Sequence, residues 1–318
     1  MGVVPVLSYA VRAVLLVTLG IVIANILAET GIFSRFSSLT GPFCRLSGLP
    51  EASILSIIAM GVNATAGKSM LANYYHEGKV REQEVIPTLI MGAFPVVLGE
   101  SLFRVHLPAA LVLLGPVVGG IYTGLNLFSS GIQGFFALLY SRRFLADHGR
   151  PQVQVSAPAA PDTPIALNRE VVISGCRKAV PTLRRVVPVT LAALIVFGLL
   201  SETGVMKIVG AAFDPVLQIV GLPGESAAAL LAQFVHFSAG YAIVASLIET
   251  GILTTGTALA TLVLGSMVVI TMIYIKYSVP LYLSLFGRFG VRVSLVTYAA
   301  SMAAKVATLL LVMVVVVM

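Results

Sequence analysis

The chain has 318 residues, of which 58% are hydrophobic and only 10% are charged, and its formal net charge is +7. Soluble proteins carry roughly 25% charged residues, so this composition excludes a soluble globular domain and places most of the chain in a lipid bilayer. The basic residues cluster in the middle of the chain without interleaved aromatic residues. We therefore interpret them as an orientation signal and predict no nucleic-acid partner.

The first half of the chain consists of apolar segments separated by short interruptions. Residues 7–28 are long enough to cross a hydrocarbon core of roughly 30 Å. Residues 34–47 mix arginines with bulky apolar residues, which predicts a segment lying on the membrane surface. An apolar helix interrupted by small and polar residues is expected at 51–76 and further spans at 85–102 and 121–140, whereas the proline-containing stretch 104–120 is not expected to span.

The second half follows the same plan after a connecting segment. Residues 141–185 join the halves, and their centre is rich in proline and alanine, which predicts a flexible linker at 146–173. Spans are expected at 187–200, 253–275 and 294–317, with a second interrupted apolar helix at 225–248. We expect Glu29 and Glu202, each followed by Thr-Gly, to end the first span of each half.

The two halves are copies at a constant offset of 173 residues (221 − 48). At this offset Gly48-Leu49-Pro50 falls on Gly221-Leu222-Pro223, and Ala66-Gly67 falls on Ala239-Gly240, without any gap. Internal repeats of this kind are the sequence signature of many transporter folds. We therefore divide the chain into a first repeat at 1–145, the linker at 146–173 and a second repeat at 174–318.

Positive charge predicts the orientation of the two repeats. The connecting segment is strongly basic, which places it in the cytoplasm, and both weakly charged termini are expected outside. The loop Gly78-Lys79-Val80-Arg81 is basic, whereas its equivalent, residues 251–254, is uncharged. Opposite charge in equivalent loops indicates inverted halves, each crossing an odd number of times. The predicted fold is an all-α polytopic membrane protein of two inverted repeats, each with about three transmembrane helices plus a re-entrant or broken helix.

The two interruptions predict a polar chamber inside the membrane. Backbone without helical hydrogen bonds is tolerated at membrane depth only where protein or a water-filled cavity receives it. The residues expected to break the helices are Gly61, Gly67 and Gly240, and the residues expected to bind substrate are Asn63, Thr65, Lys68, Gln233, His236 and Ser238. The alternative is that the polar side chains only cap the broken helix ends.

Ionisable residues within apolar segments are further candidates, because charge is costly in the membrane. Lys68 is expected to pair with a carboxylate, to contact an anionic substrate group or to reach the interface. For Lys305 we favour snorkelling or an internal salt bridge over substrate contact. Glu100 lies near a span end, where a surface position and a proton-coupling role are both open.

Other chemistry is not supported by the pattern. Residues 61–69, GVNATAGKS, imitate a phosphate-binding loop, but five residues instead of four separate Gly61 from Gly67. No nucleophile–base pair or cluster of metal ligands occurs, and Cys44 and Cys176 have no zinc-type neighbours. The sequence therefore predicts no enzyme, no metal site and no cofactor. A coupling ion, Na⁺ or H⁺, and a homo-oligomer stay open.

The duplicated block, with small-residue breaks at 61–67 and 236–240, resembles the nucleoside recognition or Gate domain family. That domain also occurs in concentrative nucleoside transporters, in the membrane part of ferrous iron transport protein B and in bacterial spore maturation proteins. It looks as if two Gate domains are joined here. The resemblance implies a transporter of a small polar solute, such as a nucleoside-like metabolite, working by alternating access around the paired breaks. A non-transporting scaffold of the spore-maturation type and an ion or metal permease are the alternatives.

Overall fold

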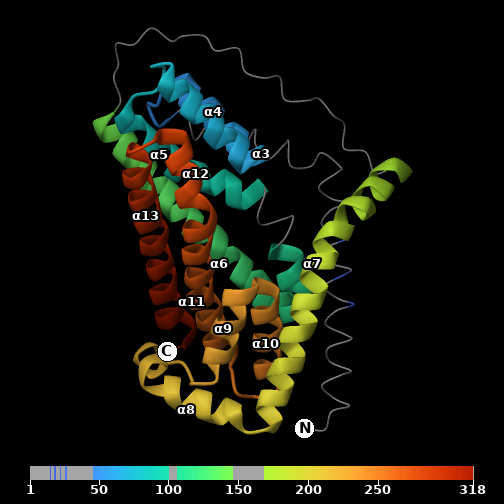
Figure 1. Cartoon of the computed structure of the whole chain (residues 1–318). Helices are drawn as coiled ribbons and strands as arrows, with labels where there is room; N and C mark the ends of the chain where they lie inside the picture. The colour runs from blue at the N-terminus through green and yellow to red at the C-terminus, as the bar shows by residue number, and fades with distance from the viewer. Residues whose placement is uncertain are drawn as a thin grey trace.

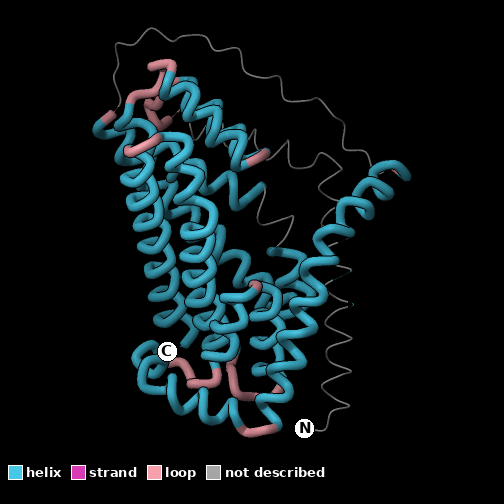
Figure 2. Tube along the Cα trace, in the orientation of Figure 1, coloured by secondary structure: helices cyan, strands magenta, loops and turns pink. Residues whose placement is uncertain are grey.

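The computed structural model describes residues 46–99, 106–145 and 168–317, together with Leu15, Thr18, Val22 and Ile26. Most of the predicted first span and surface segment, the linker centre, Cys44, Glu29 and Glu100 lie outside the described residues. Helices account for nearly all of the described chain, and loops lie mainly at the two ends of the molecule (Figure 2). The chain is therefore all-α, as predicted.

The helices of the first repeat are α3 (Glu51–Val62), α4 (Ala64–His76), α5 (Glu82–Val96) and α6 (Leu107–Phe144). Those of the second are α7 (Arg169–Glu202), α8 (Val205–Leu217), α9 (Ser226–Val235), α10 (Phe237–Glu249), α11 (Thr255–Ile273), α12 (Val279–Phe286) and α13 (Phe289–Val312). Short helical turns follow α8, α11 and α13, namely η2 (Gln218–Val220), η3 (Tyr274–Ser278) and η4 (Met313–Val317).

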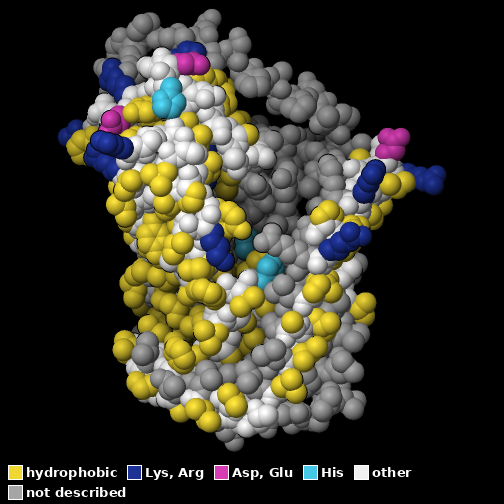
Figure 3. Space-filling model, viewed as in Figure 1, with side chains coloured by type: hydrophobic (Ala, Val, Ile, Leu, Met, Phe, Trp, Pro, Cys, Tyr) yellow, Lys and Arg dark blue, Asp and Glu magenta, His cyan; other side chains and the backbone are white. Residues whose placement is uncertain are grey.

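Among the described residues, three helical stretches are long and apolar enough to cross a membrane: Leu107–Phe144, Thr255–Phe286 and Phe289–Val315. Hydrophobic side chains cover the face of the molecule over α11 and α13, and charged side chains gather toward one end (Figures 1 and 3). A continuous apolar surface of this kind is the surface that a bilayer stabilises. The chain is therefore a membrane protein.

The stretch 104–120 contains a sharp turn. Within α6, Gly115 has φ +80° and ψ 171°, so residues 107–114 form a separate short helix before the long one. A Cβ atom on Gly119 would collide with the Ala110 carbonyl, which shows that the short helix folds back on the long one. The short helix is about 12 Å long, too short to cross the membrane alone. The second repeat has the same device, with Gly287 (φ +58°) between α12 and α13.

The long helices that close the two repeats run in opposite directions. Lys305 contacts Asn126, and Ser301, four residues earlier on α13, contacts Gln133, seven residues later on α6. Equivalent helices that pack antiparallel are the arrangement that inverted repeats require. Accordingly, α3 and α4 lie toward one end of α11 and α13, and α9 and α10 lie toward the other (Figure 1).

The short helix of each repeat packs against the helical hairpin of the other repeat, where the hairpins are α3–α4 and α9–α10. The short helix at the start of α6 shares a hydrophobic cluster with α9 and α10, in which Ala110 and Ala242 are fully buried. In the same way α12 packs against α3 and α4, where Tyr282 and Leu71 share a second cluster. His76 Nε2 also hydrogen-bonds the Leu285 carbonyl across this contact, at 2.8 Å. The two halves therefore form one interlocked body.

The segment that joins the two repeats differs from its predicted form at its C-terminal end. Helix α7 begins at Arg169, so residues 169–185, which we expected to belong to the connecting segment, are helical. The proline-rich composition ends at Pro164, and residues 169–180 contain no proline that would stop the helix. The helix ends at Glu202, as predicted. The amphipathic helix α8 then crosses the lower end of the molecule (Figure 1), at the position equivalent to the surface segment predicted in the first repeat.

Candidate functional site

Both interrupted helices are broken at the same point of the repeat. Asn63 separates α3 from α4 with φ −149° and ψ 113°, and His236 separates α9 from α10 with φ −160° and ψ 135°. Asn63 Oδ1 accepts a hydrogen bond from the Ala66 N–H at 2.9 Å. His236 Nδ1 accepts one from the Ser238 N–H at 3.2 Å and also lies 2.7 Å from Ser238 Oγ. Both residues therefore cap the helix that follows them.

The glycines near the breaks allow the two arms of each hairpin to meet. A Cβ atom on Gly67 would fall on the backbone of Met60, and one on Gly240 would fall on the Gln233 side chain and 3.0 Å from the Ala229 carbonyl. Such contacts require α4 to fold back on α3 and α10 on α9. Gly61 lies inside α3, where its Cβ would meet Pro95 of α5 at 3.2 Å. The residues with broken backbone are Asn63 and His236, and the glycines provide close packing beside them.

We expect the loss of the first cap to destabilise the fold. Asn63→Ala removes the acceptor for the Ala66 N–H, and lost N-caps cost about 1 kcal/mol of unfolding free energy. The measurement is the thermal stability of the purified protein in detergent. Asn63→Ser, which retains a capping oxygen, should stay close to the wild type. Loss of solute binding by Asn63→Ala at unchanged stability would instead assign Asn63 to the substrate.

A cavity of about 270 Å³ lies between the two repeats. Its wall draws on both hairpins, on α5 and α11, and on the paired helices α6 and α13. Of the residues predicted to bind substrate, Lys68 and Gln233 line this cavity. Asn63, Thr65, His236 and Ser238 are not among its lining residues. The lining of the cavity comes mainly from the arms of the hairpins, and Phe237, which follows His236, is the lining residue nearest a break.

Repeat-equivalent positions line the cavity with different chemistry. Met60 and Gln233 occupy matching places: a Cβ on Gly92 would collide with the Met60 sulfur, and a Cβ on Gly265 with the Gln233 amide. Lys68 and Tyr241 are also equivalent and both line the cavity. Gln233 is 2% exposed, and neither its Nε2 nor its Oε1 has a hydrogen-bond partner. Because a buried amide without partners costs free energy, Gln233 indicates a place for a ligand.

A chain of polar contacts forms one wall of the cavity. His106 Nδ1 lies 3.1 Å from the Tyr241 hydroxyl, which donates to the Tyr122 hydroxyl at 3.4 Å. Asn126 Nδ2 donates to the Tyr122 carbonyl at 3.0 Å, one turn along α6. These side chains join the first repeat to the hairpin of the second, so a displacement of α10 would alter the cavity wall directly.

Lys305 lies inside the protein, contrary to the expectation that it snorkels or forms an internal salt bridge. It is 6% exposed, lines the cavity and donates from Nζ to Asn126 Oδ1 at 2.5 Å. Its position on the face of α13 that packs against α6 prevents the side chain from reaching the interface. Lys68 approaches the ring of Tyr282, with Nζ 5.3 Å from the ring centroid, a distance at which cation–π attraction operates.

Several cavity residues were not recognised from the sequence. Tyr241 has a signal in the repeat, because it lies at the position equivalent to Lys68. His106 and Tyr122 have no comparable signal, since isolated histidines and tyrosines in apolar segments are common. Asn126 is an amide within a predicted span, and polar residues in spans usually face the bundle interior.

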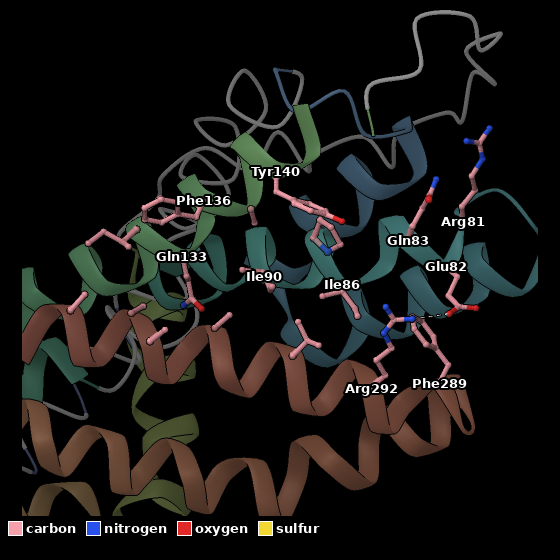
Figure 4. A pocket seen from close by; sticks show the side chains of 18 residues that line it. Arg81, Glu82, Gln83, Ile86, Ile90, Gln133, Phe136, Tyr140, Phe289 and Arg292 are labelled. Atoms are coloured by element: carbon pink, nitrogen blue, oxygen red, sulfur yellow. Dashed lines mark ion pairs between the residues drawn. The ribbon is translucent and has the colours of Figure 1, made fainter. Parts of the chain in front are cut away.

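A second hollow of about 1030 Å³ opens on the side of the molecule between α5, α6 and α13 (Figure 4). Its charged residues gather at one end, where Arg292 pairs with Glu82 at 3.8 Å (Figure 4). The remainder is mostly apolar, and half-exposed Phe136 and Tyr140 stand along α6. Lipid tails would occupy a mostly apolar groove on a membrane-facing side, so this groove needs no other ligand to account for it. The central cavity is therefore the candidate functional site.

Comparison with known proteins agrees with this architecture. A family model described as nucleoside recognition matches residues 10–116 and 183–289, at the same offset of 173 residues (183 − 10) as the repeat. Three proteins of Methanocaldococcus jannaschii are similar, among them uncharacterized protein MJ0880, which is 39% identical over 96% of this chain and 98% of its own length. Uncharacterized protein MJ0871 is 25% identical over 92% of this chain and 90% of its own. No solved structure matches.

Proposed function

The chain belongs to the nucleoside recognition, or Gate, family of membrane proteins, and from this premise we propose that it transports a small polar solute through the cavity between its two repeats. The observation that carries the proposal is Gln233, a buried amide without partners on the wall of a cavity shared by both hairpins. A nucleoside-like metabolite is the first candidate, with Lys68 and Gln233 contacting it directly.

The interlocked hairpins supply a route to alternating access. Each hairpin packs against the short helix of the other repeat, and each short helix joins its long helix through a glycine with positive φ, Gly115 or Gly287. Positive φ is open to glycine at little cost, so these turns can change conformation more easily than the helices they join. Rocking of one hairpin with its partner short helix would expose the cavity to one side at a time.

The capping residues take a supporting part in this proposal. Asn63 at one tip and His236 with Ser238 at the other hold the helix starts, and a solute passing the tips would meet these side chains and Thr65, which lies beside Asn63. We retain the cytoplasmic placement of the linker and the outside placement of both termini, and we propose Na⁺ or H⁺ as the coupling ion. The placement of the linker and of the termini rests on the charge distribution, and the coupling ion is proposed by analogy with secondary transporters that share the repeat plan.

Counterflow into proteoliposomes tests the proposed function. Purified protein is reconstituted into liposomes preloaded with one unlabelled solute, and entry of the same labelled solute is followed for uridine, adenosine, uracil, orotate, glutamine and glutamate. We expect saturable entry of at least one solute that empty liposomes do not show. Absence of exchange for every solute, together with absence of any thermal stabilisation by them, would favour a non-transporting scaffold and overturn the proposal.

A further inference from the structure

The cavity wall contains a buried lysine whose charge no carboxylate of the described lining balances. Lys305 lines the cavity, and none of the described residues that line it is an aspartate or a glutamate. A membrane protein usually pairs an internal cation with a carboxylate or exposes it to water.

The surroundings of Lys305 explain why an anion would suit this cavity. Its side chain is removed from solvent, and the partner of its Nζ is the neutral carboxamide of Asn126. A neutral acceptor replaces only part of the hydration that a buried ammonium loses, whereas an anion within hydrogen-bond distance would supply both charge and acceptor. Asn126 holds the ammonium in place at the cavity wall, so little reorganisation is needed when an anion arrives.

A second donor that suits an anion lies on the wall of the same cavity. The Gln233 amide, whose hydrogens have no acceptor, lines the cavity together with Lys305. Ligand sites for drug-sized molecules occupy roughly 300–1,000 Å³, so a cavity of about 270 Å³ fits a small metabolite. We propose that the transported solute is a small organic anion, whose carboxylate or phosphate group is held between Lys305 and Gln233. This inference rests on the proposed function and narrows its substrate class.

Matched pairs of solutes that differ by one anionic group test the inference. Binding to the purified protein is measured by isothermal titration calorimetry for uracil and orotate, uridine and uridine 5′-monophosphate, and glutamine and glutamate. In at least one pair we expect the anionic member to bind tenfold or more tightly than its neutral partner. This comparison uses the wild-type protein and does not depend on any variant folding.

Variants then assign the preference to a residue. Lys305→Gln should reduce the preference for the anion to about onefold, and Lys305→Arg, which keeps the charge, should retain most of it. Lys276→Gln is the matched control, because Lys276 is exposed and lies outside the cavity. Equal anion preference in Lys305→Gln and wild type would overturn the assignment to Lys305.

The two proposals fail in different ways. If neutral members bind and exchange as well as anionic members or better, the anion inference is overturned while the transport function stands. If no solute of either kind exchanges in the counterflow assay, the transport function fails and the inference fails with it.

Discussion

Gln233→Met is expected to abolish solute binding while leaving the fold intact. The equivalent position of the first repeat already holds a methionine, Met60, packed against the equivalent pair of glycines. The Gln233 side chain makes no hydrogen bond that the substitution would remove, and the two side chains have similar volume. The variant therefore removes a ligand-binding amide with little packing cost. The measurements are binding of the preferred solute by calorimetry, expected to weaken at least 100-fold, and thermal stability, expected within a few degrees of the wild type.

The reciprocal variant serves as the control. Met60→Gln places a second amide on the cavity wall without removing the first, so solute binding through Gln233 should persist. Met60 is fully buried between Gly67 and Gly92, and an added amide there costs stability unless the solute or water satisfies it. Normal binding by Gln233→Met would remove the central support for the candidate site.

Gly67→Ala is expected to have the largest effect on the fold. The added methyl group would occupy the space of the Met60 backbone, which cannot move aside as the end of a flexible side chain can. The arms of the first hairpin would have to separate, which disturbs the packing of α3 against α5 and of α4 against α12. We expect a loss of about 3 kcal/mol of unfolding free energy. Size-exclusion chromatography and thermal unfolding of the purified protein would detect it.

Gly124→Ala is the matched control for this substitution. It lies within α6, and a Cβ atom there would meet nothing within 4 Å. Alanine is the better helix former by about 1 kcal/mol, so this variant should be as stable as the wild type or slightly more stable. A Gly67→Ala protein of wild-type stability would show that the two arms do not pack as closely as described.

The sequence predicted the architecture because the same interrupted helix occurs in both repeats. A break found only at Asn63 would be ambiguous, but its recurrence at His236 with the same spacing pointed to a structural device. The turn at Gly115 was not predicted, although the prolines of the stretch 104–120 indicated that this stretch does not span the membrane. Glycines, prolines and breaks in an apolar helix are local signals, because they depend only on the backbone conformations that a segment can adopt.

The cavity lining was harder to predict because it depends on which faces of distant helices meet. Lys305 and Asn126 lie far apart in the sequence and in different repeats, and no local pattern reports their hydrogen bond. Asn63 and His236 attracted a functional interpretation because they are polar, whereas their side chains bond to the adjacent helix starts. Conversely, Tyr241 looks like an ordinary aromatic core residue until its equivalence with Lys68 is considered.

The difference between Gln233 and Met60 bears on how solute selectivity changes among related proteins. The two repeats have equivalent sockets, each built from a pair of glycines, and the sockets hold different side chains at the same position of the repeat. Relatives that handle other solutes are therefore expected to differ at Met60, Lys68, Gln233 and Tyr241 while retaining glycine at 67, 92, 240 and 265. One backbone framework would in this way bind different solutes, and the side chains at these four positions would determine which solute it selects.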